Sequence, residues 1–333
     1  MPTVLVTPEA VREQDGPYAT ALRAAGFEIR YPRNPQFARG LCSEAETIEE
    51  LSLADATIAS GEMYSPDVLA ALPRLRVIAR CGVGYDRVDV PAATARDVVL
   101  TITPKTNREA VAELALALML GVAKALVIND RHVRAGRWPR KLLLPLRGTT
   151  LGIFGLGRIG SSLAVRAIAL GMRVIATESA PDRDFARAHG IELVDFETLL
   201  ATSDFLSIHC PLTDQTRGLF DRAVFARMKT GSTLINTSRG RVLVESDLVA
   251  ALQSGHLGGA GLDVYEQEPP DPANPLFQLN NVVLSPHLAG TDETSLAGMA
   301  LEAAECIVQL RQGQWPAGAV INEQLRTTWR WSR

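Results

Sequence analysis

The stretch Thr150-Leu-Gly-Ile-Phe-Gly-Leu-Gly-Arg-Ile-Gly160 decides the fold of this chain. Its first half is an apolar run that predicts a β-strand, and the glycine-rich turn after it leads into a predicted helix. Gly155 permits a tight turn, Gly157 lets phosphate groups approach the backbone, and Gly160 allows the helix to pack closely on the strand. Strand, turn and helix in this order are typical of a dinucleotide-binding α/β unit, in which a pyrophosphate lies at the helix N-terminus.

The next predicted strand, Arg173–Thr177, leads into Glu178, where the glycine pattern has an acidic residue. A carboxylate here can accept hydrogen bonds from the ribose hydroxyls of the adenosine half and would repel a 2′-phosphate. We therefore expect the cofactor to be NAD, with NADP less favoured, although Arg183 and Arg187 follow close by and keep NADP open. For the glycine pattern taken alone, a plain turn followed by an exposed glutamate is the alternative.

Strands and helices alternate on both sides of the glycine turn, which predicts parallel sheets and an α/β fold. With 333 residues the chain is long enough for two domains. A long Ala/Leu-rich helix is expected from Asn107 to about His132. The helical pattern Glu293–Arg311 is followed by too little chain for a third domain. We expect residues 1–103 plus 286–333 to form one domain and 104–285 the other, with a cleft between them.

Composition and charge exclude several classes of protein. Apolar residues make up 47% and charged residues 21%, the balance of a packed globular protein, and a net charge of −3 offers no broad positive field to a nucleic acid. Four scattered cysteines without a C-x-x-C pair predict no disulfide framework and no metal site, and fit a reducing compartment. The apolar segment Leu114–Ala123 is far shorter than the roughly 20 residues that cross a bilayer. We expect a cytoplasmic protein without a membrane segment.

Polar residues follow three apolar strands at their carboxyl ends, where open α/β sheets bind ligands. These residues are Arg239, Glu268 and His287. The planar guanidinium of an arginine suits a carboxylate, and a histidine exchanges a proton near neutral pH. A carboxylate beside the histidine would orient it and favour its charged form. Together they fit a site that binds an organic acid and moves one proton.

Each of the three has a simpler interpretation and a rival. Arg239 could be a surface arginine at a helix start, with Arg241 equally placed. Glu268 lies in a loop where an exposed charge is usual, and Glu266 is its rival. His287 could merely satisfy a backbone carbonyl, while His209 also stands at a strand end. No member of the set is convincing without the others.

Several segments, taken in order, resemble the D-2-hydroxyacid dehydrogenase family over almost the whole chain. They read Asn-Thr-Ser-Arg-Gly-Arg at 236–241, Gly-Leu-Asp-Val-Tyr-Glu-Gln-Glu-Pro at 261–269 and Ser-Pro-His-Leu-Ala-Gly at 285–290, with further similar stretches at 80–89, 103–107 and 209–213. Several spaced motifs in order are far more specific than one glycine turn. The resemblance implies two Rossmann-like domains, a flavodoxin-like catalytic domain and an NAD-binding Rossmann domain, and a homodimer formed through the nucleotide domain.

The same resemblance implies an activity and roles for the residues. A hydride would pass between nicotinamide and C2 of a small D-2-hydroxy acid or 2-keto acid. Arg239 would bind the substrate carboxylate and keto group, His287 would be the acid/base, and Glu268 would pair with it. The backbone of Gly82, Val83 and Gly84 would also hold the carboxylate. The implied cofactor contacts are Gly155, Gly157, Arg158, Ile159 and Gly160 at the pyrophosphate, Glu178 at the ribose, Cys210, Pro211 and Thr216 around the adenosine half, and Thr237 and Asp263 near the nicotinamide.

The chain departs from some members of the family. Phosphoglycerate dehydrogenases usually carry an arginine just before the serine that ends a catalytic-domain strand, and the matching pair here is Ala59-Ser60. This favours an unphosphorylated substrate and leaves D-3-phosphoglycerate dehydrogenase as an alternative. Val83 stands where phosphite dehydrogenases have a lysine, and Glu268 where formate dehydrogenases have a glutamine. A non-catalytic, NAD(H)-sensing corepressor-like protein is the alternative from another class.

Overall fold

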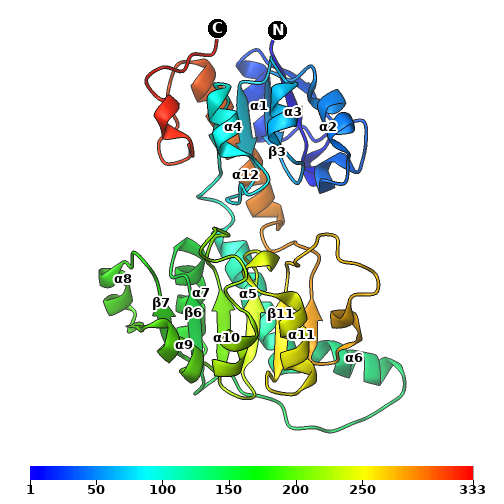
Figure 1. The fold of residues 1–333 in the computed structure, drawn as a ribbon, viewed down its shortest axis with the longest axis vertical. Coiled ribbons are helices and arrows are strands. Elements are labelled where there is room, and N and C mark those ends of the chain that lie inside the picture. The colour runs from blue at the N-terminus through cyan, green and yellow to red at the C-terminus, as the bar shows by residue number, and fades with distance from the viewer. Residues whose placement is uncertain (333) are drawn as a thin grey trace. The chain divides into compact units, whose positions relative to one another are not determined.

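The computed structural model describes residues 1–332, which form two compact units. One unit joins Met1–Asn107 to the segment that begins at Gly290, and the other is Arg108–Ala289. Each unit holds a single parallel sheet with helices on both faces (Figure 1). The α/β class expected from the sequence is confirmed.

The first unit has a five-stranded sheet in the order β2-β1-β3-β4-β5, which is the flavodoxin-like order. Its strands are β1 (Thr3–Val6), β2 (Glu28–Arg30), β3 (Ala56–Ala59), β4 (Val77–Arg80) and β5 (Val99–Thr101). Its helices are α1 (Pro17–Ala24), α2 (Glu44–Leu51), α3 (Pro66–Ala70), α4 (Val90–Ala95) and α12 (Glu293–Arg311), with short 3-10 helices η1 (Glu9–Val11), η2 (Phe37–Arg39) and η5 (Glu323–Leu325).

Side chains of the central strands of this sheet alternate between two apolar cores. Val4 and Val6 of β1 belong to the core beneath α1 and α12, whereas Leu5 between them belongs to the core beneath α2 and α3. A strand buried on both faces reads as a continuous apolar run because successive side chains point to opposite faces. The segment that returns from the second unit, through α12, therefore supplies one wall of the first unit's core.

The second unit has a seven-stranded sheet in the order β12-β11-β10-β9-β6-β7-β8. The strand order reverses between β6 and β9, which creates the crevice where such sheets bind dinucleotides. Its strands are β6 (Thr150–Phe154), β7 (Arg173–Thr177), β8 (Glu192–Leu193), β9 (Phe205–Ile208), β10 (Thr233–Asn236), β11 (Gly259–Leu262) and β12 (Val282–Leu284). Its helices are α5 (Arg108–Ala123), α6 (Leu126–Arg134), α7 (Arg158–Ala169), α8 (Arg183–Ala188), α9 (Phe196–Thr202), α10 (Arg222–Arg227) and α11 (Glu245–Gln253), with 3-10 helices η3 (Gly240–Val242) and η4 (Pro275–Gln278).

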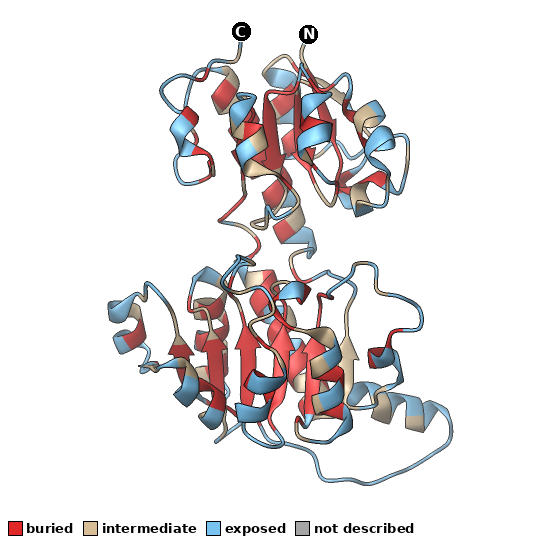
Figure 2. Ribbon diagram, in the orientation of Figure 1, coloured by how far each residue is buried: buried red, intermediate tan, exposed pale blue. Residues whose placement is uncertain are grey.

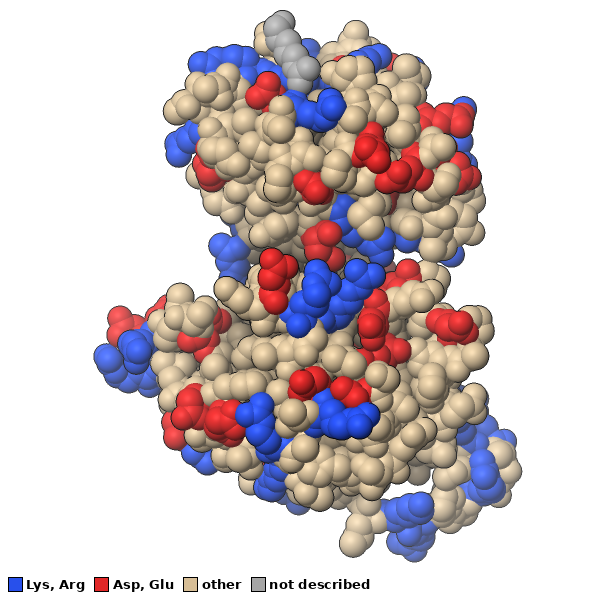
Figure 3. Space-filling view, viewed as in Figure 1, with Lys and Arg blue, Asp and Glu red and all other residues tan. Residues whose placement is uncertain are grey.

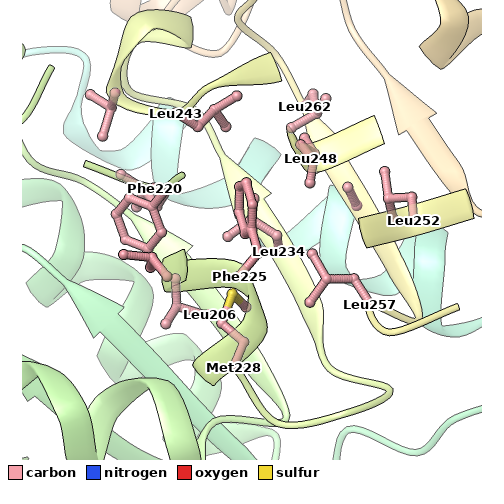
Figure 4. Close-up of a cluster of buried hydrophobic side chains, with 14 of the residues drawn as sticks. Leu206, Phe220, Phe225, Met228, Leu234, Leu243, Leu248, Leu252, Leu257 and Leu262 are labelled. Carbon is pink, nitrogen blue, oxygen red and sulfur yellow. The ribbon is translucent and has the colours of Figure 1, made fainter. Parts of the chain in front are cut away.

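Helices cover both faces of the larger sheet, and its inner strands are mostly buried, whereas the edge strands β8 and β12 are not (Figure 2). On one face, Leu206, Leu234 and Leu262 of three strands form a cluster with Phe225 of α10 and Leu248 of α11 (Figure 4). On the other face, α5 and α7 pack on each other and on the sheet. The sheet is thus a rigid support, and its carboxyl edge is where side chains can be positioned for a ligand.

The single helix expected from Asn107 to His132 is wrong, because the chain bends by 57° between α5 and α6. Ala125 between them has a left-handed backbone, with φ of 49°. The apolar run that buries α5 ends at Ala123, and α6 buries none of its residues. Within residues 1–332 no single helix is long and apolar enough to cross a membrane, and α5 and α6 pass that test only together, by length and composition.

The Trp/Arg-rich segment near the C-terminus packs on the first unit. Trp329 is 6% exposed, and its indole N–H donates to the carbonyl of Asp97 at 2.8 Å. The guanidinium of Arg76 lies over the Trp329 ring at 5.5 Å, and Trp331 meets Phe27 edge-on at 5.5 Å between ring centroids. These contacts secure the segment after α12 to residues that precede β2, β4 and β5.

Surface charges of both signs lie in mixed groups on the face shown in Figure 3. Many form exposed ion pairs, such as Arg39 with Glu9 at 3.1 Å and Arg33 with Glu49 at 2.8 Å. Exposed pairs of this kind contribute about 0–1 kcal/mol each. The charges that bear on function are therefore the few that are buried or that lie at strand ends.

Candidate active site

The glycine turn after β6 has the geometry that a pyrophosphate site needs. Gly155 has φ of 101°, and a Cβ there would lie 2.9 Å from the backbone nitrogen of Cys210. A Cβ on Gly160 would lie 2.2 Å from the carbonyl oxygen of Gly155, so α7 can approach β6 only with glycine. At Gly157, just before α7, nothing lies within 4 Å of an added Cβ. The backbone at Gly157, where α7 begins, is thus open to an approaching anion.

Glu178 and Cys210 lie at the ends of the neighbouring strands. The Glu178 carboxylate accepts from the Ser179 hydroxyl at 3.0 Å and from the Ala180 N–H at 3.2 Å. Burial raises the pKa of the Cys210 thiol to about 12, and the negative charge of Glu178 acts in the same direction. Cys210 is therefore a neutral packing residue near neutral pH and not a nucleophile.

The hydroxyl of Thr216 holds the segment after β9, and two buried polar atoms of the second unit are left to bind a ligand. The Thr216 hydroxyl accepts from the N–H of Thr213 at 2.8 Å and donates to the carbonyl of Pro211 at 2.7 Å. Within residues 1–332, the buried hydroxyl of Thr237 and Nδ1 of His209 have no hydrogen-bond partner. Buried polar groups are normally satisfied, so these two atoms fit a site that is completed by a bound dinucleotide.

The turn that carries Arg239 is fixed by Asn236 at the end of β10. Asn236 is fully buried; its side-chain oxygen accepts from the Ser238 N–H at 3.0 Å, and its amide nitrogen donates to the Arg239 carbonyl at 3.0 Å. The Arg239 side chain is half-buried and donates from Nη1 to the Ser238 carbonyl at 2.7 Å. The guanidinium is thus set at the carboxyl edge of the sheet.

Gly240 brings this turn against the loop that carries Glu268. A Cβ on Gly240 would lie 1.9 Å from both the carbonyl carbon and the oxygen of Tyr265. Only a glycine allows such an approach of two backbones. Gly240 was not predicted as a site residue, although its place beside Arg239 in the motif was a usable signal.

Arg241 and Glu266, the alternatives to Arg239 and Glu268, form hydrogen bonds in the same region. Arg241 donates from Nε to the Glu266 carbonyl at 3.1 Å. The carboxylates of Glu266 and Glu245 accept reciprocally from each other's backbone N–H, at 3.3 and 3.2 Å. Arg241 therefore joins the loop to η3, and Glu266 joins it to the start of α11. His209, the third rival, is bonded from Nε2 to Ser207 at 2.8 Å, and burial lowers its pKa to about 4.

His287 and Glu268 form a direct pair. Nδ1 of His287 lies 2.7 Å from Oε2 of Glu268, and the side chains are 45% and 24% exposed. The other carboxylate oxygen accepts from the Tyr265 N–H at 3.0 Å. Burial opposes ionisation of Glu268, but the hydrogen bond and charge of His287, the Tyr265 N–H and the charge of Arg239 outweigh it and lower its pKa. No residue among 1–332 bonds Nε2 of His287, so that nitrogen is available for proton exchange.

A buried aspartate holds the turn on which His287 sits. His287 has a left-handed backbone with φ of 57°, a conformation that costs a non-glycine residue about 1–2 kcal/mol. Asp263 is fully buried, and its two oxygens accept from the N–H groups of Leu288 at 2.8 Å and Ala289 at 2.9 Å. These bonds stabilise the turn. Asp263, which the resemblance placed near the nicotinamide, thus has a structural task in addition to any contact with a cofactor.

The loop Gly82–Gly84 belongs to the first unit. The Gly82 N–H donates to the Thr103 hydroxyl at 2.8 Å, and the Gly82 carbonyl accepts from the Thr103 N–H at 3.0 Å. Nε of Arg80 donates to the carbonyl of Gly84 at 3.0 Å. No residue in the described part of the chain accepts from the N–H of Val83 or Gly84. Two of the three expected amide donors are therefore available to a ligand, and Gly82 shapes the loop.

A sheet in the Rossmann order with an open glycine turn, and a histidine–glutamate pair beside an arginine at the same carboxyl edge, define the class of dinucleotide-dependent oxidoreductases. The chain belongs to the D-isomer specific 2-hydroxyacid dehydrogenase family, and residues 116–289 match the model of that family's NAD-binding domain. It is accordingly an NAD-dependent oxidoreductase of the 2-hydroxyacid class, as the sequence predicted.

Curated relatives and solved structures agree with this assignment. The chain is 40% identical over 291 residues to a glyoxylate reductase of Korarchaeum cryptofilum, covering 85% of this chain and 88% of the relative. It is 39% identical over 274 residues to a D-3-phosphoglycerate dehydrogenase of Archaeoglobus fulgidus, covering 81% of this chain and 52% of that protein. A D-lactate dehydrogenase of Aquifex aeolicus, solved with NAD and lactic acid, has a TM-score of 0.82 at 28% identity, covering 96% of this chain and 98% of that one.

Proposed function

We propose that the protein interconverts a small, unphosphorylated D-2-hydroxy acid and its 2-keto acid. The observation that carries the proposal is the 2.7 Å pair of His287 and Glu268. It lies in the unit that matches an NAD-binding domain, and the contact at Gly240 joins its loop to the turn of Arg239. An acid/base and a carboxylate-binding cation are what oxidation at C2 of a hydroxy acid requires.

Arg239 binds the substrate carboxylate and the oxygen on C2 through its planar guanidinium. The charge that develops on this oxygen is stabilised by the same cation, which strengthens the contact as the reaction proceeds. The free N–H groups of Val83 and Gly84 in the first unit supply further donors to the carboxylate.

His287 takes the hydroxyl proton at Nε2 during oxidation and returns it during reduction. Glu268 holds the ring by Nδ1, which leaves Nε2 to exchange the proton. Because its pKa is lowered, Glu268 stays ionised throughout the neutral range. NAD, when bound, supplies the hydride acceptor at nicotinamide C4.

The cofactor is held by the second unit in this proposal. The N–H groups at the start of α7 bind the pyrophosphate, Glu178 accepts from the ribose hydroxyls, and the unpartnered Thr237 hydroxyl lies at the nicotinamide end. The proposed set is Gly155, Gly157, Arg158, Ile159, Gly160, Glu178, Cys210, Pro211, Thr216, Thr237 and Asp263. Selection of NAD over NADP is proposed to come from Glu178.

An unphosphorylated substrate is favoured by the end of β3. Ala59 is fully buried there and offers no charge, and Ser60 follows it. The curated glyoxylate reductase also matches over most of its length, whereas this chain spans about half of the phosphoglycerate dehydrogenase. Phosphorylated 2-keto acids are the competing substrate class.

The test is to follow NADH oxidation with purified protein and glyoxylate, hydroxypyruvate, pyruvate and 3-phosphohydroxypyruvate, with NADPH in parallel. Turnover of an unphosphorylated acid supports the proposal, and preference for the phosphorylated one contradicts it. His287→Asn should lower turnover by about a hundredfold to ten-thousandfold while NADH still binds, since general acid–base catalysis contributes about 10²–10⁴. Near-normal turnover of this variant would refute the assignment.

We also propose a homodimer formed through the second unit. Helix α6 buries none of its residues, and the segment after it is rich in exposed apolar side chains. The exposed set is Leu126, Val127, Val133, Trp138, Leu142, Leu143 and Leu144. Contiguous exposed apolar residues of this kind typically mark a protein interface.

The four cysteines are free thiols, which supports proposing the cytoplasm as the compartment.

Light scattering should give the mass of a dimer for the parent protein. Leu142→Asp combined with Leu143→Asp should give a monomer, whereas Leu53→Asp, at a half-exposed position of the first unit, should not. A monomeric parent, or a double variant that stays dimeric, would show that this surface is not the interface.

A further inference from the structure

Tyr265 lies where the segments of the proposed catalytic site meet. It follows the end of β11 closely and is 6% exposed. Its N–H donates to Oε1 of Glu268 at 3.0 Å, and its hydroxyl donates at 3.0 Å to the carbonyl of Ser285, which shortly precedes His287 in the chain. Its carbonyl group lies against Gly240. One buried residue thus contacts every segment that carries a proposed catalytic side chain.

The ring of Tyr265 is fixed in the apolar core of the second unit. It belongs to the buried cluster that contains Val242 of η3 and Leu276 of η4, and Leu284 of β12 packs against that cluster. Burial, and after it the negative charge of Asp263, raises the pKa of the hydroxyl to about 12. The hydroxyl therefore keeps its proton and remains a donor throughout the neutral range. A buried tyrosine hydroxyl normally finds one partner, and here the partner is a backbone carbonyl of the site.

The Ser285 carbonyl is a point at which the turn of His287 is held. The Ser285 N–H donates to the carbonyl of Leu262 at 2.8 Å, so Ser285 is joined both to β11 and to Tyr265. Pro286 follows, and its ring restricts the backbone between Ser285 and His287. The orientation of Ser285 is therefore passed on to His287.

Asp263 holds the same turn on its other side, because it accepts from the N–H groups of Leu288 and Ala289. Hydrogen bonds thus flank His287, whose left-handed backbone, with φ of 57°, lies between them. Without the hydroxyl of Tyr265, the bonds to Asp263 remain and the segment before His287 gains freedom.

We propose that Tyr265 is a positioning residue that holds the acid/base pair at one separation. Its backbone fixes Glu268 and its hydroxyl fixes the segment that carries His287, so both partners are placed relative to the same buried residue. This inference rests on the proposed function, in which His287 exchanges the substrate proton. Tyr265 itself moves no proton.

Tyr265→Phe is the test, because phenylalanine keeps the ring and the backbone N–H and removes only the hydroxyl. The kcat for the best keto acid should fall about tenfold, since a misplacement of about 1 Å costs roughly a hundredfold and one lost hydrogen bond moves the segment by less. The KM for the keto acid should stay within about twofold of the parent, because Arg239 and the loop Gly82–Gly84 bind the substrate. The kcat is referred to the concentration of NADH-binding sites, so that unfolded protein does not contribute to the fall.

The tautomer of His287 gives a readout that does not need turnover. The ionised Glu268 bonded to Nδ1 keeps the ring proton on that nitrogen, since the tautomer is set by the hydrogen bond that the ring makes. Nitrogen NMR of the neutral ring, assigned by its loss in His287→Asn, should show the Nδ1–H tautomer in the parent. Tyr265→Phe should show a measurable share of the Nε2–H tautomer, because the pair is held less firmly.

Tyr18→Phe is the matched control. Tyr18 is 2% exposed in the first unit, and its hydroxyl donates to the carbonyl of Val11 at 2.8 Å, so this variant loses a buried hydrogen bond of the same kind. It should keep the kcat, the KM and the His287 tautomer of the parent.

A folded Tyr265→Phe variant with the kcat and the tautomer of the parent overturns the inference. A fall in kcat with the parent tautomer also overturns it, because the pair would be intact, and so does an equal fall in Tyr18→Phe. If the parent reduces no 2-keto acid, the proposed function fails, and the tautomer alone then decides whether Tyr265 holds the pair.

Discussion

Gly240→Ala should separate the two halves of the proposed catalytic site. The new Cβ would lie 1.9 Å from the Tyr265 carbonyl group, whereas ordinary contacts begin at 3.4 Å, so one backbone must move by about 1.5 Å. Neither backbone can move at low energetic cost, because Asn236 is hydrogen-bonded to the Arg239 turn and the Tyr265 N–H donates to Glu268. A misplacement of about 1 Å lowers activity roughly a hundredfold.

Two measurements test this expectation. Steady-state NADH oxidation, with the best keto acid of the panel, should show kcat/KM reduced about a hundredfold or more. Urea unfolding should show a loss of about 1–3 kcal/mol, the usual range for overpacking. Gly16→Ala is the control, since a Cβ there meets only the Tyr18 ring at 3.4 Å; it should keep full activity and lose at most about 1 kcal/mol. Activity of Gly240→Ala within a few fold of the parent would refute the argument that this contact positions the site.

Three further outcomes follow from the geometry. Glu268 has a lowered pKa in the folded protein, so its ionised form stabilises the fold above the ordinary pH range of glutamate titration. This contribution is lost as pH falls through the folded-state pKa. The difference in unfolding free energy between the parent and Glu268→Gln should therefore be constant near pH 7 and shrink only in acid. Glu178→Ala should raise the ratio of kcat/KM for NADPH to that for NADH by about tenfold or more, and an unchanged ratio would mean that Glu178 does not read the ribose. Trp329→Ala should destabilise the protein by about 3–5 kcal/mol in urea unfolding, because the indole is buried and hydrogen-bonded, and a loss below about 1 kcal/mol would contradict its role in securing the tail.

Much of the fold was predictable because buried parallel strands read as short apolar runs. Strands β6 and β7 and helix α12 have the expected bounds, since their patterns are strong and their ends carry glycine or polar residues. Strand β2 was not predicted because it is a three-residue edge strand without a fully buried side chain. The bend at Ala125 was missed because no glycine or proline marks it.

The candidate site was predictable where chemistry lies next to a strand end. Arg239, Glu268 and His287 each follow such a strand, so residue type and position pointed to them together. Gly240 was not predicted as a functional residue, because its importance depends on a contact with a distant part of the chain. The burial of Glu62 was not predictable either, because a glutamate in a loop is usually exposed and its donors include Thr7, just after β1, and Ser60, just after β3.

The composition of the first unit's core imposes an order on the folding of the two units during synthesis. The face of its sheet that contains Val4 and Val6 is closed by Ala300, Ala304 and Ile307 of α12. A ribosome releases those residues only after the whole of the second unit, whose residues are contiguous in the chain. The second unit can therefore fold first, while strands β1 to β5 wait with an apolar face uncovered. Chaperones that shield apolar surface should accordingly engage nascent chains between about residue 100 and α12, and release them when that helix emerges.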